Sequence, residues 1–329
     1  MKKILLFVLL FSVLCGCRTV PITGRKQFVA LPSFYMNSLA ISSFAEVRST
    51  HRIATNTRDS EMIQRVGNRI RRAVEEYLAQ ENLSHLTRDF AWEFILIEDP
   101  TINAWVMPGA RIAFYTGILP VCKNEDGVAV VMAHEIAHAL ANHAAERMSR
   151  ALVTQLGGMA ISVALSERPE ITQALAMSVF GIGTTVFSAL PHSRRNELEA
   201  DRLGLIFMSM AGYDPHEAPR FWERMMALSG NKSASDFLST HPSNARRIRE
   251  INNHIPEALT YFRPQPGGST PTTSARARRS NSDPAAILAP APTQSTTNRS
   301  RTTAPNQTPA PAPTPAPAPS GTDRSRTTR

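Results

Sequence analysis

Apolar and polar residues alternate along residues 59–83 with the period of a helix. Met62, Val66 and Ile70 follow one another at four-residue spacing, and charged residues take the positions between them. Because an α-helix turns once every 3.6 residues, this spacing puts the apolar side chains on one face. The pattern predicts an amphipathic helix over 59–83, preceded in residues 18–57 by a short lead-in and a further helix.

Two strand-like runs follow at 91–97 and 111–116, and Pro108-Gly109 is a turn signal between them. We expect them to form a hairpin. A hairpin just before a reactive helix suggests an edge strand that holds an extended substrate peptide by main-chain hydrogen bonds. The alternative, that the strands only cover the hydrophobic core and bind no substrate, stays open at this point. The positions that such an edge would offer to a substrate are Asn103, Arg111, Ala113 and Tyr115.

Residues 124–149 predict a buried helix that is apolar on nearly every side and contains the motif His134-Glu135-x-x-His138. Residues four apart on a helix share a face, so the two imidazoles are placed as neighbouring metal ligands must be. Glu135 is the next residue after His134 on the helix, where its carboxylate can take a proton from a metal-bound water. The alternative is a set of three polar groups that are hydrogen-bonded within a core. On the same helix, His143 is expected to point away and to act as a structural hydrogen-bonding residue.

Helical patterns continue through the rest of the folded part. The apolar stretches at 151–165 and 171–190 predict a buried helical pair, with contact to a bilayer as the alternative. Three further helices are expected at 193–211, 214–229 and 246–255. The fold class is therefore mainly α with a small β-sheet, that is, α+β.

Both ends of the chain differ from its middle. Residues 1–16 have the charge and the short apolar run of a signal peptide, and Leu14-Cys15-Gly16-Cys17 resembles a bacterial lipobox. By that resemblance Cys17 carries lipid and anchors the chain to the envelope membrane, the outer membrane being favoured because Arg18 follows. An ordinary cleaved signal peptide is the alternative. Residues 263–329 are rich in Pro, Ala, Thr and Arg and predict a disordered tail.

Charge adds little about partners. The chain has 329 residues and a formal net charge of +9, of which the tail from Arg263 supplies +7 through nine Arg and two Asp. The part expected to fold, residues 17–262, is therefore close to neutral. No basic patch interleaved with aromatic residues accompanies the charge, so we expect no nucleic-acid partner.

A catalytic zinc usually has three protein ligands and keeps one position for water. The third-ligand pattern that extends H-E-x-x-H in metzincins is absent, because Ala141 and Ala144 stand at its positions. Glu197 and Asp201 share a helical face, so one can bind the metal while the other supports a ligand histidine. His192 competes with Glu197 for the ligand role on chemistry alone.

Several motifs occur in an order that resembles peptidase family M48, which includes HtpX, the CAAX prenyl proteases, the mitochondrial Oma-type proteases and bacterial lipoprotein members. The resemblance spans about residues 17–255. The matching motifs are Thr23-Gly24-Arg25-Lys26-Gln27, Asn103-Ala104 with Pro108-Gly109, Thr116-Gly117, His134-Glu135-x-x-His138, Glu197-x-Glu199-Ala200-Asp201 with Gly204, Gly212-Tyr213-Asp214-Pro215, and Thr240-His241-Pro242-Ser243 with Arg247-Ile248.

The resemblance implies a zincin-like (gluzincin) domain over 17–262 that holds one zinc ion per chain. It implies Glu197 as the third zinc ligand and Asp201 as the supporting aspartate. In the family, the histidine that matches His241 either occupies the fourth zinc position in latent enzymes or steadies the oxyanion. Arg247 matches an arginine near the site. The resemblance therefore implies that His241 and Arg247 are catalytic residues.

The expected function is a zinc endopeptidase of the bacterial cell envelope that degrades misfolded or misassembled envelope proteins, with Glu135 as general base. Its expected partners are polypeptide substrates, a membrane reached through the lipid anchor, and outer-membrane assembly machinery. The alternative is a chaperone-like outer-membrane assembly factor whose zinc site is latent.

Overall fold

The computed structural model describes residues 17–165 and 192–264. Within the first range, side chains are described only as far as residue 154. The predicted signal peptide (1–16), the second predicted apolar helix (171–190) and the predicted tail beyond residue 264 lie outside the described residues. The division into signal peptide, peptidase domain and tail therefore stays a prediction.

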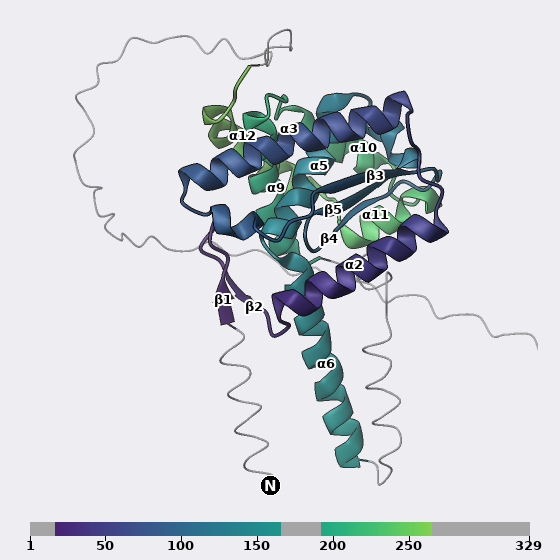
Figure 1. Ribbon diagram of the computed structural model, residues 1–329, viewed down its shortest axis with the longest axis vertical. Helices are drawn as coiled ribbons and strands as arrows, with labels where there is room; N and C mark the ends of the chain where they lie inside the picture. The colour runs from purple at the N-terminus through teal and green to yellow at the C-terminus, as the bar shows by residue number, and fades with distance from the viewer. Residues whose placement is uncertain (1–16, 166–191, 265–329) are drawn as a thin grey trace, which may run out of the picture. The chain divides into compact units, whose positions relative to one another are not determined.

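Helices make up most of the described chain (Figure 1). The longer helices are α2 (Ser33–Thr50), α3 (Arg58–Gln80), α5 (Glu125–Leu140), α6 (His143–Leu165), α9 (Arg194–Met210), α10 (Glu217–Ala227) and α12 (Ala245–Thr260). The shorter ones are η1 (Ser84–Thr87), η2 (Thr116–Ile118), α4 (Leu119–Cys122), η3 (Lys232–Ala234) and α11 (Ser235–Thr240). Within these residues, no helix has the length and apolar character needed to cross a membrane.

The predicted helix at 59–83 forms as α3, and its first turn is closed by a capping box. The Thr57 hydroxyl accepts from the Ser60 amide, and the Ser60 hydroxyl accepts from the Thr57 amide. The helices predicted at 193–211, 214–229 and 246–255 form as α9, α10 and α12, the last of which runs five residues further. The mainly helical α+β class is thus confirmed.

Two small sheets occur in the described residues. The first pairs β1 (Cys17–Thr19) with β2 (Lys26–Phe28) in an antiparallel ladder that the sequence did not predict. The second contains β3 (Glu93–Ile97), β4 (Ala104–Met107) and β5 (Arg111–Tyr115) in the order β3-β5-β4. Here β3 and β5 run parallel, while β4 and β5 form the antiparallel pair that turns at Pro108-Gly109, where Gly109 has φ +80°.

This order corrects the predicted hairpin. The two predicted strands are β3 and β5, but they lie parallel because the chain first crosses to β4 at the far edge and then returns through the centre. The strand 111–116 is therefore central and not an edge. Its main-chain groups face β3 on one side and β4 on the other, so Arg111, Ala113 and Tyr115 cannot offer them to a peptide.

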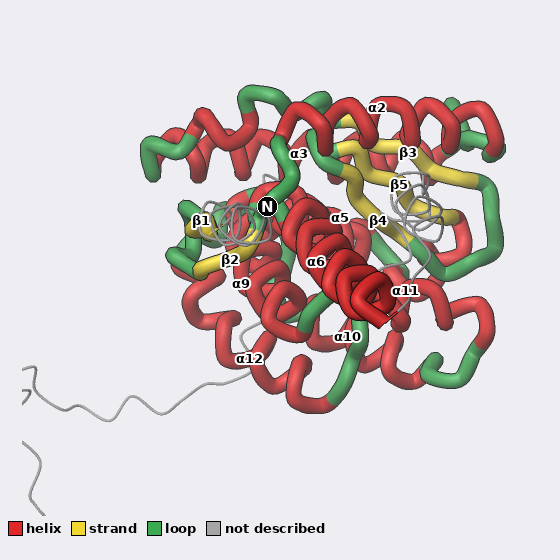
Figure 2. Tube along the Cα trace, turned by 90° about the horizontal axis from the view of Figure 1, so that it is seen from below, coloured by secondary structure: helices red, strands yellow, loops and turns green. Residues whose placement is uncertain are grey.

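Side chains of the second sheet alternate between two cores. Phe94, Leu96 and Phe114 pack with α3 and α5, whereas Ile95, Trp105 and Ala113 pack against α2. Successive strand residues point to opposite faces, so a strand buried on both sides must be apolar on both. These strands are apolar except at Glu93 and Arg111, which are half-buried first residues. Figure 2 shows α2 beside the strands and β4 as the edge strand nearest α5.

Helix α9 packs closely along α5, with α12 on its far side (Figure 1). Gly204 lies at this crossing, and a Cβ built on it would be 3.1 Å from the main-chain nitrogen of His134. A side chain at 204 would push the two helices apart. Gly204 is seven residues from Glu197, two turns along the same face of α9, so this close approach also sets how near Glu197 comes to α5.

Candidate metal centre

Helix α5 holds the H-E-x-x-H motif in the interior. The Asn124 side chain caps its first turn by accepting from the Gly127 amide. His134, Glu135 and His138 are buried, each with at most 2% of its surface exposed. Three polar side chains at this depth must be satisfied by partners or by an ion, because burying them alone is costly.

Helix α5 ends earlier than predicted. We expected one helix through residue 149, but α5 stops at Leu140 and the chain turns at Asn142, whose φ of +57° is left-handed, before α6 begins at His143. The turn brings His143 back toward α5, and its Nδ1 lies 2.7 Å from Nδ1 of His138. His143 therefore contacts a predicted ligand directly instead of pointing away, although it is a hydrogen-bonding residue as expected.

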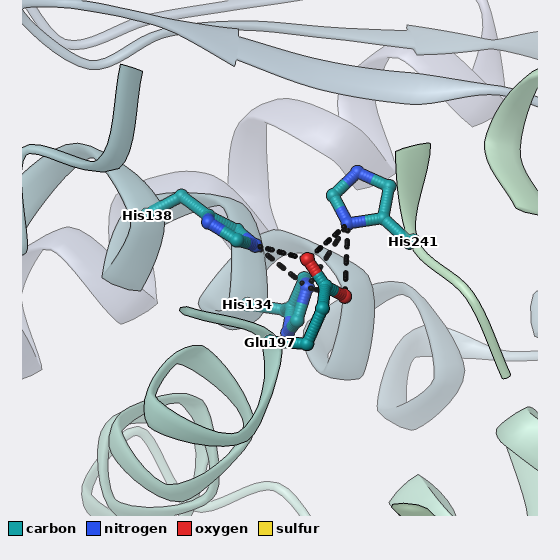
Figure 3. A group of neighbouring side chains, drawn as sticks. All are labelled: His134, His138, Glu197 and His241. Atoms are coloured by element: carbon teal, nitrogen blue, oxygen red, sulfur yellow. Dashed lines mark hydrogen bonds and ion pairs between the residues drawn. The ribbon is translucent and has the colours of Figure 1, made fainter. Parts of the chain in front are cut away.

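The structure brings four predicted residues together from three parts of the chain. Ligand atoms of His134, His138, Glu197 and His241 all lie within 4.8 Å of one another (Figure 3). The two Nε2 atoms of the motif are 2.9 Å apart, and Nε2 of His138 is 3.3 Å from Oε1 of Glu197. Nδ1 of His241 is 3.2 Å from both Glu197 oxygens.

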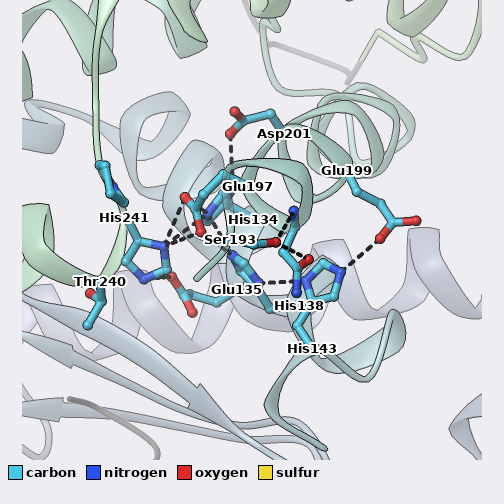
Figure 4. Close-up of polar contacts among 12 residues, drawn as sticks. His134, Glu135, His138, His143, Ser193, Glu197, Glu199, Asp201, Thr240 and His241 are labelled. Atoms are coloured by element: carbon cyan, nitrogen blue, oxygen red, sulfur yellow. Dashed lines mark hydrogen bonds and ion pairs between the residues drawn. The ribbon is translucent and has the colours of Figure 1, made fainter. Parts of the chain in front are cut away.

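The hydrogen bonds behind the two histidines fix which nitrogens carry protons (Figure 4). Nδ1 of His134 lies 3.0 Å from the Asp201 carboxylate, and the negative charge there favours a proton on this nitrogen. Nε2 of His143 lies 2.8 Å from the Glu199 carboxylate and donates there, so Nδ1 of His143 accepts from Nδ1 of His138. When His134 and His138 are neutral, each Nε2 atom then carries a lone pair, and the two lone pairs face each other.

Two lone pairs at 2.9 Å repel unless a proton or a metal ion lies between them. The Glu197 carboxylate adds a third acceptor at the same point, and all three side chains are buried. Two imidazole nitrogens and a carboxylate are a donor set that zinc prefers. The residues present therefore fit a zinc ion held by His134, His138 and Glu197.

Buried charges around the group act on its protonation. Burial disfavours the charged form of His134, but hydrogen bonds and charge from Asp201 and Glu197 outweigh it and raise the pKa to about 9. Burial, together with the neighbouring His134 charge, holds the pKa of His138 well below its ordinary value. Without metal, the pair thus carries one proton beyond the two on its Nδ1 atoms, and this further proton sits on His134.

Arg247 binds both carboxylates that support the group. Its Nη1 lies 2.8 Å from Glu197, and its Nε and Nη2 donate to Asp201 at 2.7 and 2.8 Å. Its guanidinium carbon stacks 3.4 Å from the centre of the Trp222 ring. These contacts orient the two carboxylates, and the catalytic role expected for Arg247 stays a prediction.

Glu135 faces the same space from the other side. Its Oε1 is buried, has no hydrogen bond within the described residues and lies 3.5 Å from Nε2 of His241. Burial raises the pKa of this carboxyl. An acceptor left without a donor at this place is suited to take a proton from water.

Asn103 is the one predicted substrate-binding residue that the structure puts beside this space. A cavity of about 10 Å³ is lined by Asn103, Ala104, Glu135, His192 and His241, and it has room for about one water molecule. His192 stacks on His138 with ring centres 3.9 Å apart, but Glu197 and not His192 lies with both motif histidines.

Sequence reasoning missed the residues that extend the network outward. Arg25, in the loop between β1 and β2, donates through Nε to Glu199 at 2.6 Å and through Nη2 to Glu146 at 2.8 Å. Arg25 could have been singled out, because it lies in one of the motifs that carry the family resemblance. No sequence pattern, however, connects Arg25 with His143. Arg147 is also buried near Glu135, and burial lowers its pKa to about 10.

A buried H-E-x-x-H helix, a carboxylate from a distant helix and an adjoining edge strand define a metallopeptidase domain. Comparison with known proteins agrees, since a model of peptidase family M48 matches residues 64–255. The chain belongs to peptidase family M48.

Its relatives include two mitochondrial metalloendopeptidases OMA1. That of Schizosaccharomyces pombe is 35% identical over 242 residues, covering 73% of this chain and 66% of the relative. That of Saccharomyces cerevisiae is 38% identical over 178 residues, covering 52% and 49%. The beta-barrel assembly-enhancing protease of Escherichia coli K12 is 29% identical over 168 residues, covering 49% and 34%. The chain thus spans between one third and two thirds of the length of these relatives.

These relatives correct the expected location. We predicted a lipid-anchored protein on the periplasmic side of the bacterial cell envelope, but the relatives with the higher identities are named mitochondrial proteins. The bacterial envelope prediction is therefore wrong. Cys17 is exposed at the start of β1, and its lipidation stays a prediction without support from these relatives.

The contact between His143 and His138 yields a first prediction. His143→Phe removes the acceptor for Nδ1 of His138, so the ring loses its orientation and the zinc affinity should fall by about 10- to 100-fold. Zinc competition with a chromophoric chelator measures this. His254→Phe on α12 is the matched control and should leave the affinity unchanged. Equal affinities in the His143 variant and the wild type would contradict the network.

The proton on His134 yields a second prediction, which concerns the pH dependence of zinc binding. Because its pKa without metal is about 9, zinc must displace this proton at lower pH. The apparent dissociation constant should rise about tenfold for each pH unit below 9, and about one proton should be released on binding at pH 7. Calorimetry in buffers of different ionisation enthalpy counts the protons. A zinc affinity that does not change between pH 6.5 and 8.5 would refute it.

Proposed function

We propose that the chain is a zinc-dependent endopeptidase that hydrolyses peptide bonds in polypeptides. The observation that carries this proposal is the convergence of His134, His138 and Glu197 beside the buried Glu135 carboxylate, whose Oε1 has no hydrogen bond within the described residues. Membership of peptidase family M48 and the metalloendopeptidase names of its relatives support it.

His134, His138 and Glu197 would hold the zinc ion, with Asp201 and Arg247 orienting His134 and Glu197. When bound, zinc supplies the chemistry that lowers the pKa of a water molecule and polarises the scissile carbonyl. Glu135 takes a proton from the attacking water and gives it to the leaving amine nitrogen. Its buried position and raised pKa suit a group that must first accept a proton and then release it.

The edge strand β4 supports an extended polypeptide as substrate. Alternate main-chain N–H and C=O groups of Ala104–Met107 face away from β5, on the side of Asn103 and Glu135. An extended peptide can pair with such an edge and lie across the metal site. Among the predicted substrate-binding residues, Asn103 keeps this role in the proposal.

His241 is proposed as a gate. Its Nδ1 joins the three other donors as a fourth, which would leave no position for water, and the space beside β4 is only about 10 Å³. A catalytic zinc site needs an open position. The arrangement therefore supports a latent state in which His241 must move before a peptide enters.

The predicted alternative, a chaperone-like outer-membrane assembly factor, stays a prediction. It shares the envelope location that the mitochondrial relatives overturn, and the name of the Escherichia coli relative belongs to that protein. Degradation of misfolded polypeptides, without the envelope location, is the proposed role that remains.

Glu135→Gln tests the chemistry. The amide cannot accept the proton, so casein cleavage should fall by about 10²- to 10⁴-fold while the bound zinc stays at one per chain. Zinc content by atomic emission and cleavage by fluorescein release are measured on the same sample. Cleavage at the wild-type rate by the zinc-loaded variant would rule out Glu135 as the base.

His241→Ala tests the gate. Removal of the fourth donor opens a position for water and enlarges the space beside β4, so casein cleavage per bound zinc should rise several-fold. Thr240→Val, which keeps the side-chain volume and removes only a hydroxyl that contacts main-chain oxygens of its own helix, is the neighbouring control. Lower cleavage with zinc retained would show that His241 assists the reaction and does not block it.

A further inference from the structure

A cavity of about 310 Å³ lies beside the donor group, between the first turns of α9 and α12. Glu197 and Leu198 line it from α9, and Pro242 lines it from the loop that follows His241. Ligand pockets span about 300 to 1,000 Å³, so this one has room for a side chain of a bound polypeptide but not for a folded partner.

Three arginines surround the cavity: Arg194 and Arg195 on α9, and Arg246 on α12. All three are exposed, and none forms an ion pair with a carboxylate among the described residues. The fourth arginine of the lining, Arg247, is committed to Asp201 and Glu197. Positive charge at the cavity is thus left without a neutralising partner from the described chain.

Two helix ends add to this charge. Helices of 17 and 16 residues begin at the cavity, α9 after its cap Ser193 and α12 after its cap Asn244. The N-terminus of a helix carries a partial positive charge and attracts anions. Among the described residues of the lining, Glu197 is the one acidic group, and its carboxylate faces the two motif histidines and so does not offset this field.

We propose, on the basis of the proposed peptidase function, that this cavity is the subsite for a substrate side chain next to the scissile bond and that it takes Asp or Glu. We name it the arginine pocket, after Arg194, Arg195 and Arg246. A carboxylate entering it meets guanidinium donors and two helix ends at once. It lies against Glu197, so a peptide paired with β4 and crossing the metal site brings an adjacent side chain to its mouth.

Peptide binding tests the arginine pocket without requiring cleavage. The full chain carrying Glu135→Gln and His241→Ala is loaded with zinc and titrated with fluorescent peptides that have amidated C-termini and differ only by Glu, Gln or Lys at one scanned position. At one position Glu should bind about tenfold more tightly than Gln and at least as much again more tightly than Lys, because guanidinium–carboxylate contacts are charge-assisted. The difference should shrink as salt is raised.

Charge reversal supplies the matched comparison. In a variant with Arg194→Glu, Arg195→Glu and Arg246→Glu together, the order of peptide affinities should invert, so that the Lys peptide binds most tightly. Glutamate is favourable in the first turn of a helix, so α9 and α12 should remain folded. Arg72→Glu, an exposed charge reversal on α3 outside the cavity, should keep the wild-type order.

Three outcomes would overturn the proposal. One is equal affinity for Glu, Gln and Lys peptides at every position. Another is charge dependence only in peptides with a free C-terminal carboxylate, which would assign the pocket to the chain end. The third is displacement of every peptide alike by anionic phosphatidylglycerol vesicles, which would assign it to a lipid headgroup. Because binding is read with Glu135 replaced, failure of catalysis and failure of the pocket are distinguished.

Discussion

The balance of buried charge between α5, α9 and the N-terminal strands constrains the rest of this structure. Five carboxylates lie at least nine-tenths buried in one connected group, against three largely buried guanidiniums, while the half-exposed Arg150 also pairs with Glu146. With His134 neutral, as a metal ligand must be, the buried groups sum to two negative charges. The carboxylates are Glu135, Glu146, Glu197, Glu199 and Asp201, and the guanidiniums are Arg25, Arg147 and Arg247. Since the interior is a poor solvent for net charge, a divalent cation at the donor group balances it and fits the lone pairs that meet there.

The same balance explains why segments far apart in sequence depend on one another. Arg25 joins β1 and β2 to Glu199, Glu199 holds His143, and His143 fixes the tautomer of His138. Removing one partner of a buried ion pair typically costs about 3–5 kcal/mol, because the other charge is left unpaired. The N-terminal strands are thus part of the metal centre, although they are far from it along the chain.

The sequence predicted the parts of the site that lie within one helix. His134, Glu135 and His138 needed only the helical period. The same period placed Glu197 and Asp201 on one face of α9, whereas the choice of Glu197 as the ligand came from the family resemblance. The helical elements followed from apolar spacing, and their bounds were close except at the end of α5, which stops at Leu140. Family resemblance was needed for His241, because a lone histidine before Pro242 has no local pattern that places it at a metal.

What the sequence could not predict depends on the direction of the chain between elements. Asn142 adopts a left-handed conformation that no apolar pattern records, and that one residue turns His143 toward His138. Strand order fails for a similar reason: a turn signal at Pro108-Gly109 marks a reversal but does not say which strand is central. Ala104–Met107 is short and entirely buried, so it lacks the alternation that would have marked it as the edge.

One loop connects the two features that the peptidase proposal treats separately. His241 faces the donors, and the next residue, Pro242, lines the arginine pocket together with Asn244. His241 is held by contacts of 3.2 to 3.5 Å to Glu197, His134 and Glu135 and by a main-chain bond to Phe237, whereas its neighbour Arg247 is fixed by short ion pairs. Filling of the proposed pocket would therefore bring a side chain against Pro242 and Asn244, directly after the residue that faces the donors. The proposed gate and the proposed pocket are thus two sides of one loop.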